Sequence, residues 1–241
     1  MARRRFFVDG IHHGHAEVAG DEAHHLVRVL RVEPGQRYEI SDGAGGVYLA
    51  TVAEARKSRV LFDVEERVAL KPLPVRIALA FALIKFDRLE WILEKGTEAG
   101  VETFIPVIAE RSEKGLEQAA PKRRERWERI VIEAAQQSRR DRLPELHDPV
   151  RLREFRCDAG VRVLLDEDPA APPLLSVLPA EREAGAQVAL LLGPEGGWTD
   201  AERVGLVDSG WRTASLGPLV LRAETAAVAG ASVVMNAWLR W

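Results

Sequence analysis

The sequence predicts an α/β protein in which a mostly parallel sheet follows a small β-barrel. Residues 1–70 contain short runs in which apolar and polar residues alternate, and residues 71–74 contain two prolines. From residue 75 onward, apolar strand-like runs alternate with helical patterns. Alternation with a period of two is typical of half-buried strands, and alternating strands and helices are typical of a parallel sheet. Two domains are therefore expected, residues 1–70 and residues 75–241.

The N-terminal part is expected to place one helix, residues 22–30, beside the barrel. A glycine-rich turn at residues 42–46 separates two of its strands. Prolines at positions 72 and 74 interrupt both periodicities, so this stretch is interpreted as a linker. The strands are expected at residues 6–8, 37–40, 47–52 and 60–64.

The C-terminal part shows the alternation of an α/β domain. One helix places Leu89, Ile92 and Leu93 on one face and is expected to stop at Gly100. A second helix is expected at residues 121–138, and a third, rich in small residues, at 225–238. The third is typical of a core helix or a subunit interface, because small side chains allow close approach. The strands are expected at residues 75–81, 104–108, 161–165 and 188–192.

The most informative motif is a turn at residues 193–197, Gly-Pro-Glu-Gly-Gly, which follows the apolar strand. Its glycines permit positive φ and close approach of the backbone to a ligand. Thr199 and Glu202 then have the spacing of a capping box, which predicts that a helix begins there. The spacing disfavours a dinucleotide fingerprint or a P-loop. An ordinary strand-to-helix connection stays open as the alternative.

A second turn, Ser-Leu-Gly-Pro-Leu-Val-Leu at residues 215–221, leads into the small-residue helix. Arg222 and Glu224 lie where this helix begins, and ionic residues beside a buried helix need a partner, a ligand or water. Backbone N–H groups at such turns are suited to binding a ligand. The two turns together predict one composite pocket.

These motifs resemble the C-terminal signature of the RsmE-type 16S ribosomal RNA (uracil-N3)-methyltransferases, which belong to the SPOUT class. The resemblance extends to residues 24–31, 42–46, 94–101 and 133–138, in the family's order along nearly the whole chain. The chain departs from the family at Leu219, where an arginine is usual.

The resemblance implies a fold that periodicity does not reveal. Residues 75–241 would form a SPOUT α/β domain with a trefoil knot, although chains rarely thread their own loops. Residues 1–70 would form a PUA-like, RNA-binding β-barrel, and the working protein would be a homodimer. The resemblance also implies S-adenosyl-L-methionine as the cofactor, bound among three turns. The implied cofactor-binding residues are Leu165, Leu192, Gly193, Gly196, Gly197, Leu216, Gly217 and Leu221.

The implied reaction needs specific groups. Loss of the proton from uridine N3 spreads negative charge onto two carbonyl oxygens, so the site needs a base and a fixed cation. Arg222 is the expected cation, because its guanidinium stays charged and planar. Glu195 is expected to orient Arg222, and Glu224 is the weaker candidate for the base. The implied substrate is the 16S ribosomal RNA of the small ribosomal subunit.

The expected RNA contacts are basic residues in two regions. The whole chain has 34 basic and 37 acidic residues, a net charge of −3, but residues 122–142 carry 8 − 4 = +4. A basic stripe on a near-neutral protein suits a localised phosphate contact, although a solvated helix face is the alternative. His24, Arg28 and Arg31 are expected on one helix face, with packing at the helix start left open for His24. The expected RNA-binding residues are Arg5, His24, Arg28, Arg31, Arg139 and Arg140.

Composition limits the remaining possibilities. A single cysteine, Cys157, excludes an internal disulfide and suits a reducing compartment. The histidines at positions 12, 13 and 15 are interpreted as a solvated turn, and no metal is expected. The basic start, residues 3–5, lacks the apolar stretch of a leader, and no membrane span is apparent. The cytoplasm is the expected location.

Two other functions stay open at this stage. One is a knotted methyltransferase that acts on another RNA position, for example a ribose 2′-OH. The other is a catalytically silent RNA-binding assembly factor, in which Leu219 marks a degenerate site.

Overall fold

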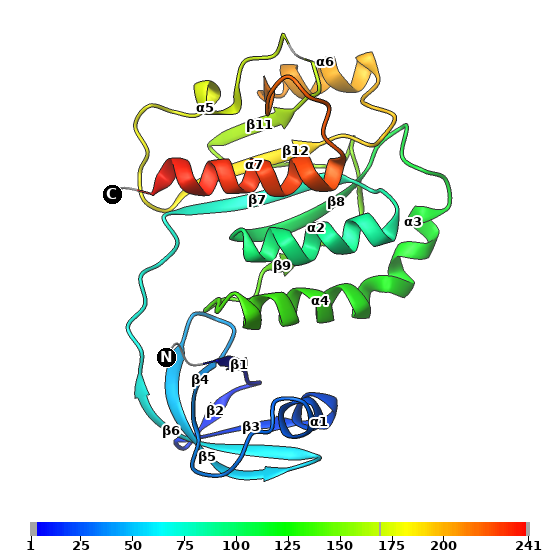
Figure 1. Cartoon of the computed structure of the whole chain (residues 1–241). Coiled ribbons are helices and arrows are strands. Elements are labelled where there is room, and N and C mark those ends of the chain that lie inside the picture. The colour runs from blue at the N-terminus through cyan, green and yellow to red at the C-terminus, as the bar shows by residue number, and fades with distance from the viewer. Residues whose placement is uncertain (1–3, 169, 240–241) are drawn as a thin grey trace. The chain divides into compact units, whose positions relative to one another are not determined.

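The computed structural model describes residues 4–168 and 170–239, so residue 3 of the basic start lies outside it. The chain divides into two compact units (Figure 1). Unit 1 comprises the chain up to Pro72 together with Ala135–Leu143. Unit 2 comprises Leu73–Ala134 and the chain from Pro144. No helix of the described chain has the length and apolar character needed to cross a membrane.

Unit 1 contains a six-stranded sheet in the order β1-β4-β5-β6-β3-β2. Only β1 and β4 pair in parallel, and all four predicted strands are confirmed. The β2–β3 hairpin was not predicted, because its strands are short and enclose the histidine-rich turn. The elements are β1 (Arg5–Phe7), β2 (Ile11–His12), β3 (His15–Ala19), α1 (Gly20–Arg28), β4 (Arg37–Ser41), β5 (Val47–Arg56) and β6 (Arg59–Arg67).

Helix α1 covers the apolar core of unit 1. Ala23 and Leu26 are fully buried and pack with Phe6 and Phe62 of the sheet. The helix ends at Arg28, and Arg31 lies beyond it with φ of 54°. The prediction that His24, Arg28 and Arg31 share one helix face was therefore wrong for Arg31, because the chain turns before reaching it.

Unit 2 contains a parallel sheet in the order β10-β8-β7-β12-β11-β13, with β9 beside β8, which confirms the predicted parallel sheet. Strands β9, β10 and β13 escaped prediction because two or three residues show no periodicity. The strands are β7 (Val75–Ala82), β8 (Val101–Ile108), β9 (Glu145–Leu146), β10 (Val150–Arg151), β11 (Val161–Leu165), β12 (Ala186–Leu192) and β13 (Arg212–Ala214). The helices are α2 (Phe86–Glu98), α3 (Leu116–Ala119), η1 (Ala120–Arg123), α4 (Arg124–Gln137), α5 (Leu174–Val177), α6 (Asp200–Asp208) and α7 (Ala223–Trp238).

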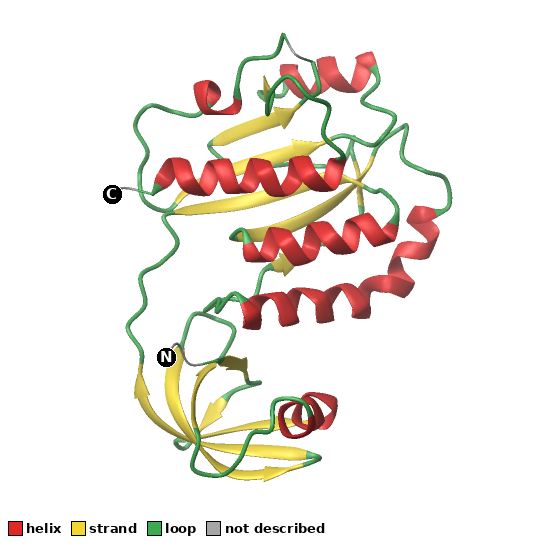
Figure 2. Ribbon diagram, viewed as in Figure 1, coloured by secondary structure: helices red, strands yellow, loops and turns green. Residues whose placement is uncertain are grey.

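Both faces of this sheet are apolar, as expected for parallel strands. On β7, Ile77 and Leu79 join the core with α2 and α7, while Ala80 and Ala82 join the opposite core with α6 (Figure 2). The small residues of α7 serve this packing: a Cβ at Gly230 would lie 2.8 Å from Leu165 Cδ1. The interpretation of α7 as a core helix is therefore confirmed.

The motif at residues 94–100 supports the fold. Lys95 pairs with Glu94 and Glu98 at 2.8 Å, and the hydrogen bonds to these carboxylates raise the pKa of Lys95 to about 12. Gly96 faces the ring of Phe104, where a Cβ would lie only 2.8 Å from Cε1. Glycine at this position lets α2 lie against β8.

We predict that Gly96→Val destabilises the protein by about 1–3 kcal/mol, because the added side chain overpacks against the Phe104 ring. The measurement is the free energy of unfolding from urea denaturation. The matched control is Gly205→Ala in α6, where an added Cβ meets no atom within 4 Å. This change should stabilise the protein by about 0.5–1 kcal/mol, since alanine is the better helix former. Equal midpoints for Gly96→Val and wild type would contradict the packing argument.

Candidate functional site

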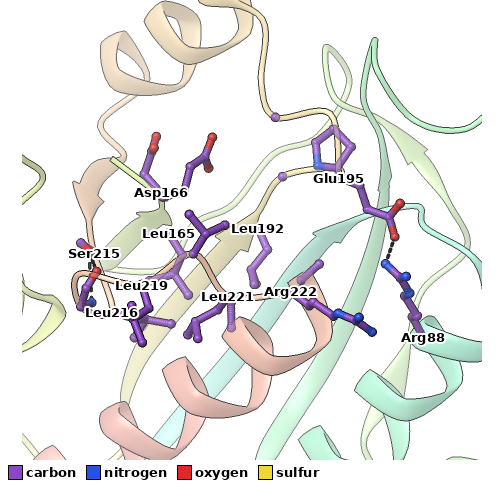
Figure 3. Close-up of a pocket in the computed structure, with 18 residues that line it drawn as sticks. Arg88, Leu165, Asp166, Leu192, Glu195, Ser215, Leu216, Leu219, Leu221 and Arg222 are labelled. Atoms are coloured by element: carbon purple, nitrogen blue, oxygen red, sulfur yellow. Dashed lines mark hydrogen bonds and ion pairs between the residues drawn. The ribbon is translucent and has the colours of Figure 1, made fainter. Parts of the chain in front are cut away.

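A cavity of about 390 Å³ opens at the carboxyl ends of β11 and β12 (Figure 3). This volume lies in the range of small-molecule sites, and such sites commonly form at the carboxyl ends of parallel strands. The lining residues are Arg88, Leu165, Asp166, Glu167, Leu192, Gly193, Pro194, Glu195, Gly197, Ser215, Leu216, Gly217, Leu219, Val220, Leu221, Arg222, Ala223 and Ala226.

The cavity brings together the two turns that the sequence singled out. Every residue selected as a cofactor contact lines it except Gly196. The carbonyl of Gly196 instead accepts a hydrogen bond from Arg111 Nη1 at 3.0 Å, outside the cavity. Nearly all of the selected residues therefore lie together, although they come from three separate stretches of the chain.

The first turn has a fixed shape. Gly197 has φ of 69°, a region that glycine adopts easily. A Cβ at Gly193 would lie 2.9 Å from Trp198 Nε1, so this position also needs glycine. The predicted capping box is confirmed, with Thr199 Oγ1 accepting from the Glu202 N–H at 3.2 Å and Glu202 accepting from the Thr199 N–H at 2.9 Å. The hydrogen bonds at the start of α6 thus fix the backbone where the first turn ends.

Hydrogen bonds hold the beginning of the second turn. The Ser215 N–H donates to Pro172 O at 2.8 Å, and Ser215 Oγ donates to Gly217 O at 3.0 Å. Beyond this point, the N–H groups of Leu216, Leu219 and Leu221 donate no hydrogen bond within the described chain. These amides are available to a ligand in the cavity.

Charged side chains lie at both ends of the cavity. Asp166, which follows β11, is buried and forms an ion pair with Arg203; its Oδ1 also accepts from the Asp168 N–H at 3.0 Å. At the other end, Arg222 extends toward an ion pair between Arg88 and Glu195 (Figure 3). One end of the cavity therefore carries Asp166 and the exposed Glu167, and the other carries Arg222 and the Arg88–Glu195 ion pair.

The three expected catalytic residues differ in their position relative to the cavity. Arg222 occupies the N-cap position of α7 without a capping hydrogen bond from its side chain, is exposed, and has no side-chain partner in the part of the chain that the structure describes. Glu195 lines the cavity but pairs with Arg88 rather than with Arg222, so the expected orienting contact is absent from the described residues. Glu224 does not line the cavity, and its buried Oε2 lacks a hydrogen-bond partner among these residues.

Sequence reasoning missed Arg88. This residue lies in the first turn of α2, 107 residues before its partner Glu195. A basic residue at this position is ordinary on a solvated helix face, so no local signal distinguished it. Only the tertiary fold brings it to the cavity.

The expected RNA contacts fall into two groups, all in unit 1. His24, Arg28, Arg31 and Arg139 are exposed. Arg5 and Arg140 are buried, with 5% and 8% of their surfaces exposed, which makes them poor candidates for the expected RNA contacts. Within residues 4–168 and 170–239, no three potential metal-binding side chains cluster.

Comparison with known proteins identifies the family. Residues 71–235 match the family model of an RNA methyltransferase domain, and residues 18–65 match that of an RNA methyltransferase PUA domain. Ribosomal RNA small subunit methyltransferase E of Bacillus subtilis is 33% identical over 225 residues, which cover 90% of this chain and 88% of the relative. The chain belongs to this methyltransferase family. The Synechocystis protein of the same name is 36% identical and covers 85% of this chain and 67% of the relative.

A solved structure of a relative contains a bound ligand. The crystal structure of ribosomal RNA small subunit methyltransferase E from Neisseria gonorrhoeae, bound to S-adenosyl methionine, is 28% identical to this chain. It aligns with a TM-score of 0.84 and covers 98% of both chains. The expected family and the PUA-like and SPOUT-type fold class are thus confirmed, while the trefoil knot stays a prediction.

Proposed function

We propose that this protein transfers the methyl group of S-adenosylmethionine to N3 of a uridine in the 16S ribosomal RNA of the small ribosomal subunit. The observation that carries the proposal is the cavity between the two glycine turns, with its cationic end at Arg222 and Arg88. Membership of the ribosomal RNA methyltransferase family supports the substrate class, and a relative bound to the cofactor supports its identity.

The residues of the cavity fit this cofactor. Leu165, Leu192 and Leu221 offer apolar walls for an adenine ring, and the available amides of the second turn can bind its polar edge. Glu167, which is exposed at the acidic end, can accept hydrogen bonds from ribose hydroxyls. The bound cofactor would supply an activated methyl group, and holding acceptor and methyl in line supplies much of the acceleration.

The cationic end fits the acceptor base. Arg222 would bind the uracil carbonyl oxygens and stabilise the charge that they gain as N3 loses its proton. Glu195 lines the same end, and Arg88 fixes its carboxylate, so Glu195 would accept that proton. Glu224 is the poorer candidate because it lies outside the cavity lining. Since Arg88 and Arg222 already supply cations there, Leu219 in place of the family arginine is compatible with activity.

The remaining parts of the proposal concern RNA and assembly. Unit 1 would bind RNA through exposed basic residues, among them Arg28, Arg31 and Arg139. The chain would act in the cytoplasm as a knotted homodimer. Leu219 and Val220 line the cavity and are 77% and 79% exposed, which supports a partner surface there, because exposed apolar patches commonly mark contacts.

Nucleoside mass spectrometry tests the proposed reaction. The protein is incubated with methyl-labelled S-adenosylmethionine and either small ribosomal subunits or naked 16S ribosomal RNA from cells that lack the gene. We expect label on a uracil base in one of the two substrates. Label on a ribose would favour the 2′-OH alternative. Absence of cofactor binding by calorimetry would favour a catalytically silent RNA-binding protein.

We predict that Gly197→Val abolishes cofactor binding in a folded protein. The residue lines the cavity with φ of 69°, which a β-branched residue adopts only with strain, and the new side chain would enter the site. Isothermal calorimetry measures the affinity, and circular dichroism checks the fold. Gly205→Ala, on α6 and outside this cavity, is the control and should bind normally. Wild-type affinity in Gly197→Val would contradict the assigned binding site.

We predict that Arg222→Lys lowers the single-turnover rate on the order of 100- to 1,000-fold, because a flexible ammonium cannot replace a planar two-pronged donor. The measurement uses saturating cofactor and RNA, so binding defects do not contribute. Arg129→Lys is the matched control, since Arg129 is an exposed arginine paired with Glu125 on α4. A rate within about threefold of wild type would remove Arg222 from the catalytic residues.

A further inference from the structure

The segment Ala135–Leu143 belongs to unit 1, although it lies far along the chain from the rest of that unit. The carbonyl of Asp141 accepts hydrogen bonds from Ser41 Oγ at 2.9 Å and from the Gly45 N–H at 3.1 Å. The Leu143 N–H donates to Gly43 O at 3.1 Å. Residues 141–143 are thus paired with the glycine-rich turn after β4, and their backbone is fixed.

A buried arginine fixes the start of the same segment. Arg5 is 5% exposed, and its Nη1 donates to the carbonyl of Arg139 at 2.6 Å. Its Nε and Nη2 donate to Glu39 Oε2 at 3.1 and 2.8 Å. A buried guanidinium is tolerated only when it is paired in this way. One guanidinium therefore connects the carboxylate on β4 with the main chain at Arg139.

Arg139 occupies a backbone position that favours glycine. It follows the end of α4 with φ of 57°, and the next N–H, of Arg140, donates to Ala135 O at 2.9 Å. This hydrogen bond is typical of a helix end in which the left-handed residue is usually glycine. The exposed Arg139 side chain makes no hydrogen bond or ion pair with any described residue, so no contact within that chain accounts for an arginine here.

Arg142 is the second exposed arginine of the segment. Its guanidinium lies over the glycine-rich turn, where a Cβ at Gly45 would be 2.7 Å from Nη2. It has no carboxylate partner within the described residues. Asp42, the carboxylate of the turn, accepts hydrogen bonds from the N–H groups of Ala44 and Gly46 at 2.8 and 2.9 Å. Glycine at position 45 leaves the space that the Arg142 side chain occupies.

We propose that Arg139 and Arg142 form a preorganised binding site for two phosphates of the RNA substrate, with Arg5 and Ser41 as positioning residues. The sequence analysis expected Arg140 as the second RNA-binding arginine of this segment. Because Arg140 is buried, we assign this role to the exposed Arg142 instead. The proposal rests on the proposed function, because it takes RNA as the ligand. Guanidinium groups bind phosphate oxygens with paired hydrogen bonds, and a fixed backbone lowers the entropy lost on binding.

The first test measures RNA affinity as a function of salt for Arg139→Gly and Arg142→Ala. Fluorescence anisotropy with a labelled 16S ribosomal RNA fragment gives the slope of log K against log salt. Each substitution should reduce this slope by about one and leave cofactor affinity unchanged. Arg139→Gly should keep or raise the melting temperature, because glycine favours the left-handed backbone. If Arg139 instead served only to stabilise the fold, Arg139→Gly would lower the melting temperature.

Arg56→Ala is the matched control, because Arg56 is an exposed arginine of unit 1 that pairs with Glu54. Its salt slope should equal that of wild type. Unchanged slopes for both Arg139→Gly and Arg142→Ala, in a preparation whose wild type methylates RNA, would overturn this inference alone. Failure of the wild type to bind cofactor or RNA would overturn the proposed function as well.

The second test is a double-mutant cycle for the positioning role. Arg5→Met should weaken RNA binding at least about threefold in the wild-type background and have little effect when Arg139→Gly and Arg142→Ala are already present. Ser41→Ala removes the hydrogen bonds that Ser41 Oγ donates to Asp141 O and accepts from the Gly43 N–H, and it keeps the Arg5–Glu39 ion pair. This variant serves if Arg5→Met fails to fold. A loss of equal size in both backgrounds would show that these residues act elsewhere, which would overturn their positioning role.

Discussion

The cavity depends on the parallel register of three strands. Leu165, the last residue of β11, lies beside Leu192, the last residue of β12, and beside Ala214, the last residue of β13. Because parallel strands leave the sheet at the same edge, the three connections that follow must start side by side. Two of them carry the glycines that allow a ligand to approach the backbone.

The charged residues at the two ends of the cavity differ. Asp166, which follows β11, lies at one end of the cavity, and Arg222 extends at the other end toward the Arg88–Glu195 ion pair. In our proposal, this arrangement orients the bound cofactor and the acceptor base. The Arg88–Glu195 pair also connects the first turn of unit 2's helix α2 with the glycine turn after β12. The same contact thus shapes the pocket and holds a carboxylate in its lining. Fixed groups of this kind need little rearrangement as charge develops.

In unit 1, a buried arginine holds the backbone from which exposed arginines extend. Arg5 is withdrawn from solvent and satisfied by Glu39, while Arg139 and Arg142 remain exposed on a backbone held by main-chain hydrogen bonds. Left-handed φ at Arg139 is intrinsically unfavourable for a residue with a Cβ, so the surrounding contacts must enforce it. In our proposal, the exposed Arg139 side chain that this backbone presents binds a phosphate of the RNA.

The sequence by itself determined the longer strands and helices and the two glycine turns, but not the short strands β2, β3, β9, β10 and β13. Periodicity, proline and glycine act over a few residues, which is why the parallel strands, the capping box at Thr199 and the turns at Gly193 and Gly217 were predictable. Only the tertiary structure decided which long charged side chains are buried and which partners they contact. Arg88 meets Glu195 across 107 residues, and Arg5 meets the carbonyl of Arg139 across 134. The burial and pairing of such groups depend on what the folded chain brings beside them, and no local pattern carries that information.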